Sequence, residues 1–402
     1  MKRHYLIIIS CLMALSLSGT LFAQTPAGLT GQTKNYISTG MPILLIAPDA
    51  TSAGMGDVGV ASTPDIYSAH WNNAKFAFID GNFGIGTTYT PWLRNLKVSD
   101  MNLLYLGAFK RINNRSTVAF SLTYFSLGEI QGTDAQGQSR GTMNPNEFAA
   151  DVTYAMKLNE NLSLGASGRY IHSDLTNGQT ISDGSGYVTT QPAKSLAADI
   201  GLYWQSPIDN NQDLALGAFI SNLGAKLSYS EDDTKKEFLP ANLRLGGRYT
   251  NHIDASNEIS ILLDANKLLV PTPPVTVGEE TYSDYYKNLT EYYNTGVIRG
   301  AVQSFYDAPG GMSEELREIQ LSVGGEYWYK QTLAARAGYF YESATKGGRQ
   351  YLTFGFGLRY TILQFDVSYL VPTTSFSSNP LSNTIRISLT INLKSPKNTP
   401  TI

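Results

Sequence analysis

Histidine, serine and acidic side chains are the residues through which this chain could catalyse a reaction or bind a metal. Its four histidines, His4, His70, His172 and His252, are spread over the length of the sequence. A multi-histidine metal site needs ligands on elements that converge, and we expect these segments to lie apart. The sequence also contains no G-x-S-x-G, G-x-x-x-x-G-K-[ST] or H-E-x-x-H motif. We therefore predict no enzymatic activity, no catalytic residue, no metal site and no cofactor.

One tripeptide, His172-Ser173-Asp174, has the residue types of a hydrolase triad. A triad needs the serine beside the histidine and an acid that orients the imidazole. These residues lie in a segment with strand periodicity, where adjacent side chains point to opposite faces. They cannot form a triad by themselves, so we interpret them as the polar end of a strand.

The elements that must position any site are strands. Every second residue between Tyr351 and Tyr360 is large and apolar, and the alternation resumes at Phe365 after a break at Ile362-Leu363. Such a strand has one apolar face and one polar face. In a soluble sandwich the apolar face packs inward, whereas in a membrane barrel it faces lipid and the interior is polar.

Fourteen alternating segments follow one another between residues 81 and 393. Connections after odd-numbered segments include long ones, and those after even-numbered segments are short. Outer-membrane barrels have this parity, with short periplasmic turns and long extracellular loops, and an even strand count places both termini in the periplasm. We predict an all-β fold, a 14-stranded transmembrane outer-membrane β-barrel over 81–393, with a long extracellular loop at 267–316 and a periplasmic tail at 394–402. The expected strands are 83–90, 101–112, 116–127, 145–158, 161–173, 194–206, 212–223, 239–251, 256–266, 317–330, 333–342, 350–361, 364–371 and 381–393.

Composition and the N-terminus are typical of an exported protein. The chain has 402 residues, 37 glycines and 25 tyrosines, and its mean hydropathy is −0.17. Residues 1–23 read as a signal peptide, with Lys2-Arg3 before an apolar core. Its removal changes the formal net charge from −3 to −5 and takes away Cys11, the single cysteine. A mildly acidic exported chain without cysteine argues against nucleic acid as a partner.

Residues 24–80 do not alternate and are rich in small and turn-forming residues. We interpret them as a plug that enters the barrel from its periplasmic end. The alternative is an exposed N-terminal arm.

Aromatic and charged residues support the barrel. Aromatic side chains recur at both ends of the expected outward faces, where amphipathic rings would form belts at the two membrane surfaces. The opposite faces carry charged residues of both signs, for which we expect a role as ion pairs bracing barrel and plug. The outer-end aromatics are Tyr89, Tyr124, Tyr170, Tyr341 and Tyr369, and the inner-end ones are Trp204, Tyr249, Tyr329 and Tyr360.

The 267–316 loop is the most informative functional feature. It begins with the semi-rigid run Val270-Pro271-Thr272-Pro273-Pro274. Long loops without secondary structure are usually functional or disordered, and tyrosines are favoured anchors of protein interfaces. We predict docking of another protein on this loop; the alternative is a loop that caps its own lumen. The candidate partner-binding residues are Tyr282, Tyr285, Tyr286, Tyr292, Tyr293, Phe305 and Tyr306.

The N-terminal region also carries a recognisable sequence. The run from Ala53 to Ala61, Ala-Gly-Met-Gly-Asp-Val-Gly-Val-Ala, precedes Asp65-Ile66-Tyr67-Ser68 and Trp71-Asn72-Asn73-Ala74-Lys75. It resembles the PorV family, outer-membrane barrels of the Bacteroidetes type IX secretion system that are related to the FadL fatty-acid transporters. The resemblance extends over nearly the whole mature chain.

The resemblance implies a function in protein secretion. PorV-like barrels bind the C-terminal signal domain of secreted cargo as it leaves the large outer-membrane translocon. They deliver it to a sortase-like surface protease, which attaches it to lipopolysaccharide. Two alternatives stay open: a FadL-type transporter of hydrophobic small molecules, and an outer-membrane lipopolysaccharide deacylase.

Overall fold

The computed structural model describes residues 35–93, 100–133, 139–176, 178, 180–182, 187–230, 235–274, 282–373 and 381–393. The expected signal peptide and the expected C-terminal tail lie outside these residues. Among the described residues, no helix is long and apolar enough to cross a membrane.

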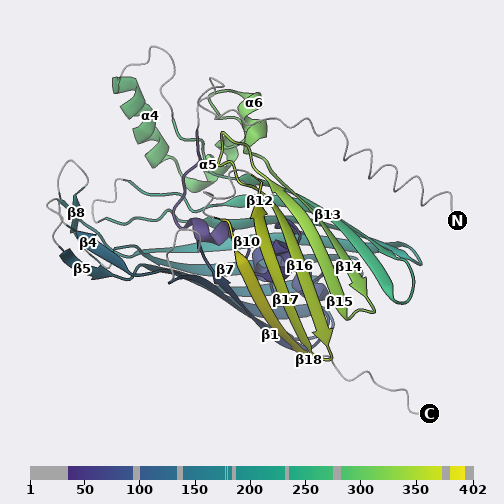
Figure 1. Cartoon of the computed structure of the whole chain (residues 1–402). Helices are drawn as coiled ribbons and strands as arrows, with labels where there is room; N and C mark the ends of the chain where they lie inside the picture. The colour runs from purple at the N-terminus through teal and green to yellow at the C-terminus, as the bar shows by residue number, and fades with distance from the viewer. Residues whose placement is uncertain are drawn as a thin grey trace.

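The fold is a closed antiparallel β-barrel of fourteen strands (Figure 1). Closure is made by β1, which pairs with β2 on one side and with β18 on the other. The predicted 14-stranded barrel is therefore confirmed. Its strands are β1 (Phe83–Pro91), β2 (Met101–Arg111), β3 (Ser116–Leu127), β6 (Asn146–Lys157), β7 (Leu162–Asp174), β10 (Ala193–Asp209), β11 (Gln212–Gly224), β12 (Asn242–His252), β13 (Asn257–Leu268), β14 (Gln320–Tyr329), β15 (Leu333–Tyr341), β16 (Gln350–Tyr360), β17 (Leu363–Pro372) and β18 (Ile385–Leu393).

Three expected strands begin three or four residues later than predicted, and one of them, expected from residue 317, begins at Gln320. The strand expected from residue 239 begins at Asn242, because Pro240 has no N–H to donate to a neighbouring strand. The strand expected from residue 381 begins at Ile385, since Asn383 has a left-handed backbone with φ of 63°. Such a local turn is not visible in a hydrophobic pattern.

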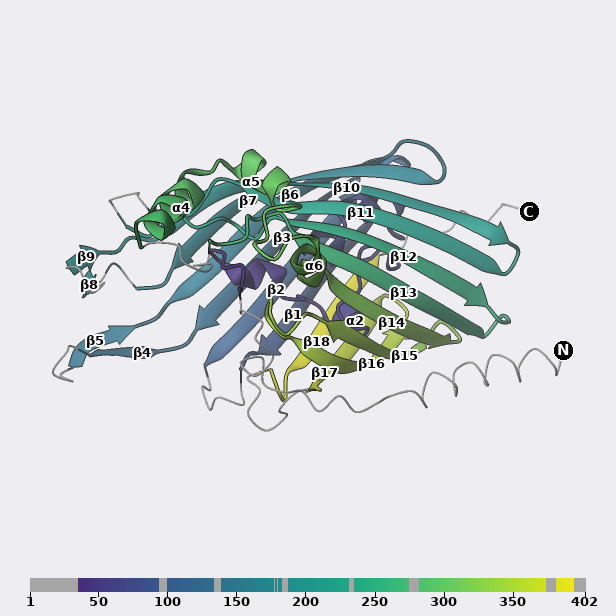
Figure 2. The same cartoon turned by 90° about the horizontal axis from the view of Figure 1, so that it is seen from above.

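The two ends of the barrel differ in their connections (Figure 2). One end has only short turns between paired strands, such as residues 330–332 and 361–362, and we call it the turn end. The other, the loop end, carries two small hairpins and a helical segment. The hairpins are β4 (Ile130–Thr133) with β5 (Ser139–Met143) and β8 (Thr180–Ser182) with β9 (Tyr187–Thr189).

The outer face is apolar and the inner face polar. In β16, Phe354 exposes 51% of its surface, whereas neighbouring Thr353 exposes 1%. Of the expected belt aromatics, Tyr89, Tyr124, Tyr170, Tyr341, Tyr249, Tyr329 and Tyr360 are exposed, and Trp204 and Tyr369 are half-buried. An apolar exterior with aromatic rings near its ends is the pattern of a membrane-spanning barrel.

The barrel interior is filled by residues 35–80. This segment forms four short helices: η2 (Pro42–Leu45), α2 (Ala50–Ala53), α3 (Ser68–Trp71) and η3 (Asn73–Phe78). The Asp49 side chain caps α2 by accepting from Ser52 N–H at 2.8 Å, and it also accepts from Trp71 Nε1 at 2.6 Å. Most of the segment is buried, and we refer to it as the plug.

The path of the plug differs from the predicted one. Asn35 lies at the loop end, where its N–H donates to Thr345 O at 3.2 Å. The plug leaves at the turn end, where Asn392 Nδ2 donates to Asp80 O at 2.9 Å before β1 begins. The described chain thus runs from loop end to turn end, and does not enter from the turn end. A hydrophobic pattern contains no signal for this direction.

Polar contacts hold the plug to the wall. Asp264 Oδ2, on β13, accepts from the N–H groups of Gly59 at 2.7 Å and Val60 at 3.0 Å. Asn72 Nδ2 donates to Leu202 O of β10 at 2.9 Å. Within the plug, fully buried Lys75 donates to Gly59 O and Ser62 Oγ. Buried polar groups are costly unless paired, so these contacts fix the plug in one position.

Ion pairs of both signs cross between strands inside the barrel. Arg169 of β7 pairs with Asp151 and Asp199. Arg336 of β15 lies 2.6 Å from Glu326 and 2.8 Å from Asp366. These ion pairs connect strands of the wall to one another inside the barrel, which is the bracing of the barrel expected from the mixed signs.

The plug approaches the wall so closely that some wall positions require glycine. A Cβ at Gly338 would lie 2.0 Å from the carbonyl carbon of Met55 and 2.2 Å from the nitrogen of Gly56. Gly168, on the exposed face, has no atom within 4 Å of a Cβ.

Gly338→Ala should therefore weaken the plugged barrel. The new methyl group meets plug backbone, and overpacking of this kind costs about 1–3 kcal/mol. Urea unfolding of the purified protein in detergent micelles measures the change. Gly168→Ala is the matched control and should stay within about 0.5 kcal/mol. Equal stability of the two variants would contradict the close contact between plug and wall.

Candidate functional site

The connection between β13 and β14, predicted as a long loop at 267–316, contains helices among its described residues. It contains α4 (Tyr282–Asn294), α5 (Val297–Gln303), α6 (Met312–Glu315) and η5 (Leu316–Glu318). Both views place α4, α5 and α6 at the loop end (Figures 1 and 2). Tyr282, Tyr285 and Tyr286 follow the i, i+3, i+4 spacing of a helix face, a signal that the loop interpretation passed over.

The structure separates the candidate aromatics into two groups. Tyr292 and Tyr293 are half-buried, and Tyr292 packs edge-on against Phe238 with ring centroids 5.6 Å apart. Lys226 donates to Tyr293 O at 3.0 Å and lies 3.7 Å above the Phe238 ring. These contacts dock the end of α4 on the connection between β11 and β12. Tyr285 is also half-buried, and the side chains of Tyr282 and Tyr286 lie outside the described residues.

Phe305 and Tyr306 belong to an exposed apolar group that the sequence prediction found only in part. Ile298 and Val302 are one turn apart on α5, and Met312 and Leu316 are one turn apart at α6 and η5. Together these six side chains form what we call the α5–α6 surface, and each exposes between 46% and 69% of its area. The i, i+4 spacing of the aliphatic residues was the available sequence signal.

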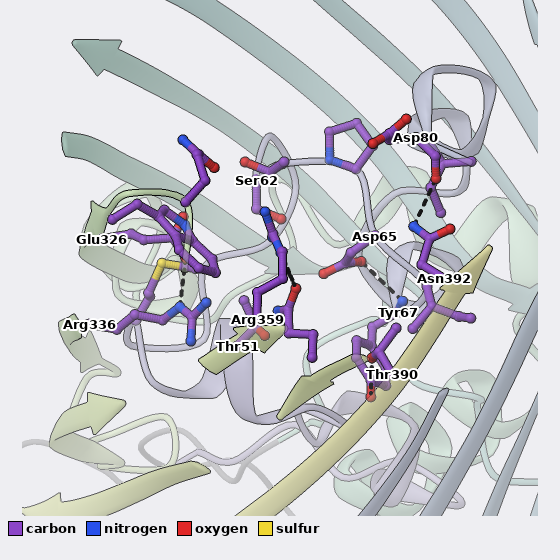
Figure 3. Close-up of a pocket in the computed structure, with 18 of the residues that line it drawn as sticks. Thr51, Ser62, Asp65, Tyr67, Asp80, Glu326, Arg336, Arg359, Thr390 and Asn392 are labelled. Carbon is purple, nitrogen blue, oxygen red and sulfur yellow. Dashed lines mark hydrogen bonds and ion pairs between the residues drawn. The ribbon is translucent and has the colours of Figure 1, made fainter. Parts of the chain in front are cut away.

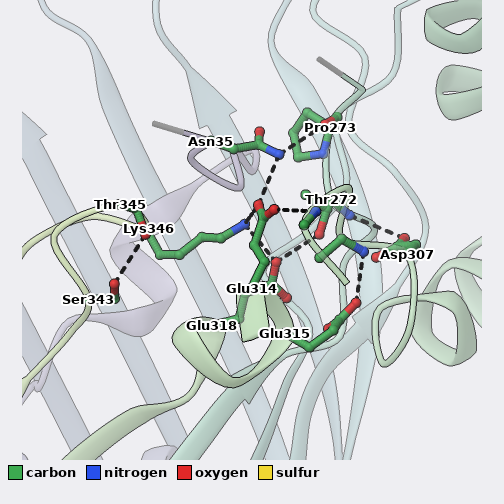
Figure 4. Close-up of polar contacts among 12 residues, drawn as sticks. Asn35, Thr272, Pro273, Asp307, Glu314, Glu315, Glu318, Ser343, Thr345 and Lys346 are labelled. Carbon is green, nitrogen blue, oxygen red and sulfur yellow. Dashed lines mark hydrogen bonds and ion pairs between the residues drawn. The ribbon is translucent and has the colours of Figure 1, made fainter. Parts of the chain in front are cut away.

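Buried ion pairs fix the base of this surface (Figure 4). Lys346 Nζ lies 2.6 Å from Glu314 and 2.9 Å from Glu318. Lys267 Nζ of β13 lies 3.1 Å from Glu315 and 2.6 Å from Glu318. We call these five residues the loop-base cluster. It joins α6 and η5 to β13 and to the connection after β15.

Hydrogen bonds extend the cluster to the plug. Asn35 Nδ2 donates to Glu314 Oε1 and to Pro273 O, both at 3.4 Å. Thr272 Oγ1 donates to Glu318 Oε1 at 2.8 Å, and Ala308 N–H donates to Glu315 Oε1 at 2.8 Å. The carboxylates therefore have partners from several segments, which offsets the cost of burying charge. Plug, barrel and helical segment meet at one point.

Two carboxyl groups near the cluster have shifted pKa values of opposite sign. Burial raises the pKa of Asp307 to about 6, although its bonds from Thr272 act in the opposite direction. Burial also acts to raise the pKa of Glu314, but bonds from Lys346 and Gly310 outweigh it and leave that pKa lowered. The difference follows from geometry, since Glu314 has a lysine partner and Asp307 lies near Glu315 and Glu318.

The histidines that could have done chemistry lie apart in the structure. His70 is in the plug against Trp71, with ring centroids 4.7 Å apart, and His172 stacks on Phe148 at 5.0 Å. His252 Nε2 lies 2.7 Å from Asp213. Among the described residues, no three His, Cys, Asp or Glu side chains are grouped to hold a metal ion.

Ser173 has partners other than its neighbouring histidine. It donates to Glu147 Oε1 at 2.6 Å and accepts from Tyr229 OH at 3.0 Å. The ring of His172 lies on the opposite face of β7. This agrees with the interpretation of the tripeptide as a polar strand end.

Comparison with solved structures finds distant likenesses. The toluene transporter TbuX of Ralstonia pickettii is 11% identical, with a TM-score of 0.47, over 86% of this chain and 98% of that chain. The toluene transporter TodX of P. putida is 12% identical with the same TM-score, over 87% and 99%. A Pseudomonas aeruginosa FadL homologue is 11% identical with a TM-score of 0.42, over 90% and 100%. A search of curated proteins gave no match.

The sequence itself matches a family model. The model describes the type IX secretion system protein PorV and matches residues 29–275, which include the plug and the strands up to β13. Since the match spans more than half of the chain, this outer-membrane barrel belongs to the PorV family of the type IX secretion system.

Proposed function

We propose that the protein binds secreted cargo, through the cargo's C-terminal signal domain, as the cargo leaves the outer-membrane translocon. It then delivers the cargo to the surface complex whose sortase-like protease attaches it to lipopolysaccharide. In this role the barrel binds and transfers, and it carries out no reaction itself. The observation that carries the proposal is the α5–α6 surface, an exposed apolar group on a fixed base in a PorV-family barrel.

We infer the orientation of the barrel in the membrane from its connections. Bacterial outer-membrane barrels have short periplasmic turns and longer extracellular loops. With the turn end in the periplasm, α4, α5 and α6 face the cell exterior, where cargo emerges. The described C-terminal strand then ends in the periplasm, and Asn35 lies on the extracellular side.

The chemistry of the α5–α6 surface fits protein recognition. Stable interfaces have an apolar centre and a polar rim, and a few large side chains carry most of the binding energy. Tyr306 and Met312 are the most exposed of the group, at 67% and 69%. Tyr292, by contrast, already packs against Phe238 of the same chain. We therefore assign cargo contact to the α5–α6 surface, and of the predicted residues to Phe305 and Tyr306.

The fixed base of the α5–α6 surface meets a second requirement for binding, which is an ordered surface. A surface that is already ordered loses less conformational entropy when a partner binds. Lys267 and Lys346 hold α6 and η5 on the barrel through nearly buried ion pairs. This arrangement favours capture of a folded signal domain.

Replacing Val302 and Tyr306 together by serine should reduce cargo binding at least tenfold. Loss of one strong interface side chain typically costs about 1–3 kcal/mol, and 1.4 kcal/mol corresponds to a factor of ten. Cargo recovered with the tagged protein from outer membranes is the readout. Ile112→Ser with Ile253→Ser removes two other exposed apolar side chains, 56% and 49% exposed, from the turn end and is the control. Cargo recovery that falls equally in both double variants would disprove the assignment.

Removal of a loop-base lysine should loosen the helical segment. Lys346→Gln leaves Glu314 without a cation and Glu318 with Lys267 alone, and removing one partner of a buried ion pair costs about 3–5 kcal/mol. Limited proteolysis of the purified protein should show faster cleavage between residues 296 and 319. Arg299→Gln, which breaks an exposed pair with Glu291 at 3.5 Å, should change little because exposed pairs contribute about 0–1 kcal/mol. Indistinguishable cleavage rates would contradict a fixed base.

The loop base should be best protected at mildly acidic pH. A carboxyl with a raised pKa, such as Asp307 at about 6, opposes folding fully above that pKa, and this opposition fades as pH falls from 6 towards its ordinary pKa of 3.8. A carboxyl with a lowered pKa, such as Glu314, stabilises above its ordinary value of 4.5 and loses that contribution below it. Hydrogen exchange of residues 305–319, corrected for intrinsic rates, should show maximal protection between pH 4.5 and 6. Asp307→Asn should flatten the rise in protection that the native protein shows as pH falls from 7 to 5. A steady fall in protection over that range in the native protein would contradict the prediction.

A further inference from the structure

A cavity of about 230 Å³ lies inside the barrel at the turn end (Figure 3). The plug segment 62–67 forms one side, and residues of β12 to β17 form much of the other. Its lining includes the turn residues Gln331, Thr361 and Ile362, which place it near the turn end. We call it the turn-end recess. It plays no part in the cargo binding proposed above.

The carboxylates around the recess have partners of their own. Glu326 pairs with Arg336 at 2.6 Å. Glu258 lies 3.0 Å from His252 Nδ1 and accepts from Gln331 Nε2 at 2.8 Å. Asp65 accepts from Tyr67 N–H at 3.0 Å and from Ser68 Oγ at 3.1 Å. A fourth carboxylate, Asp80, also has an interaction partner.

The guanidinium groups around the recess have fewer suitable hydrogen-bond partners than the carboxylates. Arg359 directs Nε and Nη2 to one neutral acceptor, Gln364 Oε1, at 3.1 and 3.0 Å, and stacks 4.3 Å above the Trp328 ring. Arg248 donates through Nη1 to Thr63 Oγ1, and its buried Nε has no hydrogen-bond partner. Nη2 of Arg336 is also buried without a partner, on a side chain with 0% exposure. The recess therefore has donors that need acceptors.

The size and lining of the recess limit what can supply those acceptors. Its apolar lining includes Met55, Ile66, Phe109, Leu262 and Ile362. An apolar cavity of about 150 Å³ admits benzene, so this space suffices for a small ring or short chain with a polar head. Four carboxylates nearby disfavour a dianion such as phosphate. Arginine binds a carboxylate with two parallel hydrogen bonds, and a carboxylate carries a single charge.

We infer that the turn-end recess binds a carboxylate attached to an apolar group, with the guanidinium groups of Arg359 and Arg248 as its cationic contacts. The apolar part packs on Leu262 and Ile362. In the orientation proposed above, the recess faces the periplasm. The carboxylate belongs to a small organic acid or to the free end of a polypeptide.

Calorimetric titration of the full-length protein in a non-ionic detergent tests the inference. The probes are benzoate, its neutral isostere benzamide, and inorganic phosphate. Benzoate should bind saturably at one site, with affinity at least tenfold above that of benzamide and of phosphate. A second pair of probes, acetyl-Gly-Gly-Phe with a free carboxylate and its amide, shows whether the carboxylate belongs to a polypeptide end or to a small acid. A peptide acid tenfold tighter than benzoate assigns a polypeptide end, and comparable affinity assigns a small acid.

Two arginine variants connect binding to the recess. Arg359→Gln and Arg248→Gln should each weaken benzoate binding about tenfold or more, since a hydrogen bond to a charged group is lost. Arg115→Gln removes the same charge from an exposed turn at the same end, where Arg115 donates to Lys157 O at 3.3 Å, and should leave affinity within twofold. Circular dichroism confirms that each variant is folded. Absence of saturable benzoate binding, equal binding of benzamide, or equal affinity in all three variants would overturn the proposal.

Discussion

The hydrogen bonding between plug and barrel wall is the constraint on which the rest of the structure depends. An apolar exterior forces the charged and polar residues of fourteen strands into the lumen, where water cannot satisfy them once the plug fills it. Asp264 accepts hydrogen bonds from the backbone N–H groups of Gly59 and Val60 in the plug. Within the wall, Arg336 pairs with Glu326 and Asp366. Each such pair fixes an atom of the plug or of the wall, so the lumen has little freedom to become an open channel.

The same constraint organises the two ends differently. At the loop end, Asn35 joins the start of the described plug to Glu314, and the lysines of the loop-base cluster join α6 to the barrel. Here each lysine of the cluster has carboxylate partners, and apolar side chains are left exposed on the outer side. At the turn end the network is incomplete, since Arg359 and Arg248 have only neutral partners. Our proposals follow this difference: paired charges fix the base of the proposed cargo surface, and guanidinium groups with only neutral partners line the proposed ligand site.

Much of the wall could be predicted because a strand with one face in lipid must alternate, and period two is visible in a sequence. The inward charges and most belt aromatics follow from the same rule. The hydrophobic pattern could not predict the three-dimensional path of segments that lack a regular period. The direction of the plug depends on contacts such as Asn35 to Thr345, between residues far apart in the sequence. The helices α4 to α6 did have a period, but the proline-rich start and the tyrosines favoured a loop. Ile298 and Met312 were missed for that reason, and Tyr292 was assigned to a partner although Phe238 of the same chain covers it.

Site-specific photocross-linking in intact cells tests the central claim, that the α5–α6 surface receives cargo outside the membrane. A photoreactive residue at position 302 should give a covalent adduct that contains the C-terminal signal domain of a secreted protein, identified by mass spectrometry. The same probe at position 112, on the turn end, should give no such adduct. Cargo captured at position 112 and not at 302 would contradict the account, and so would capture at neither position while secretion proceeds normally.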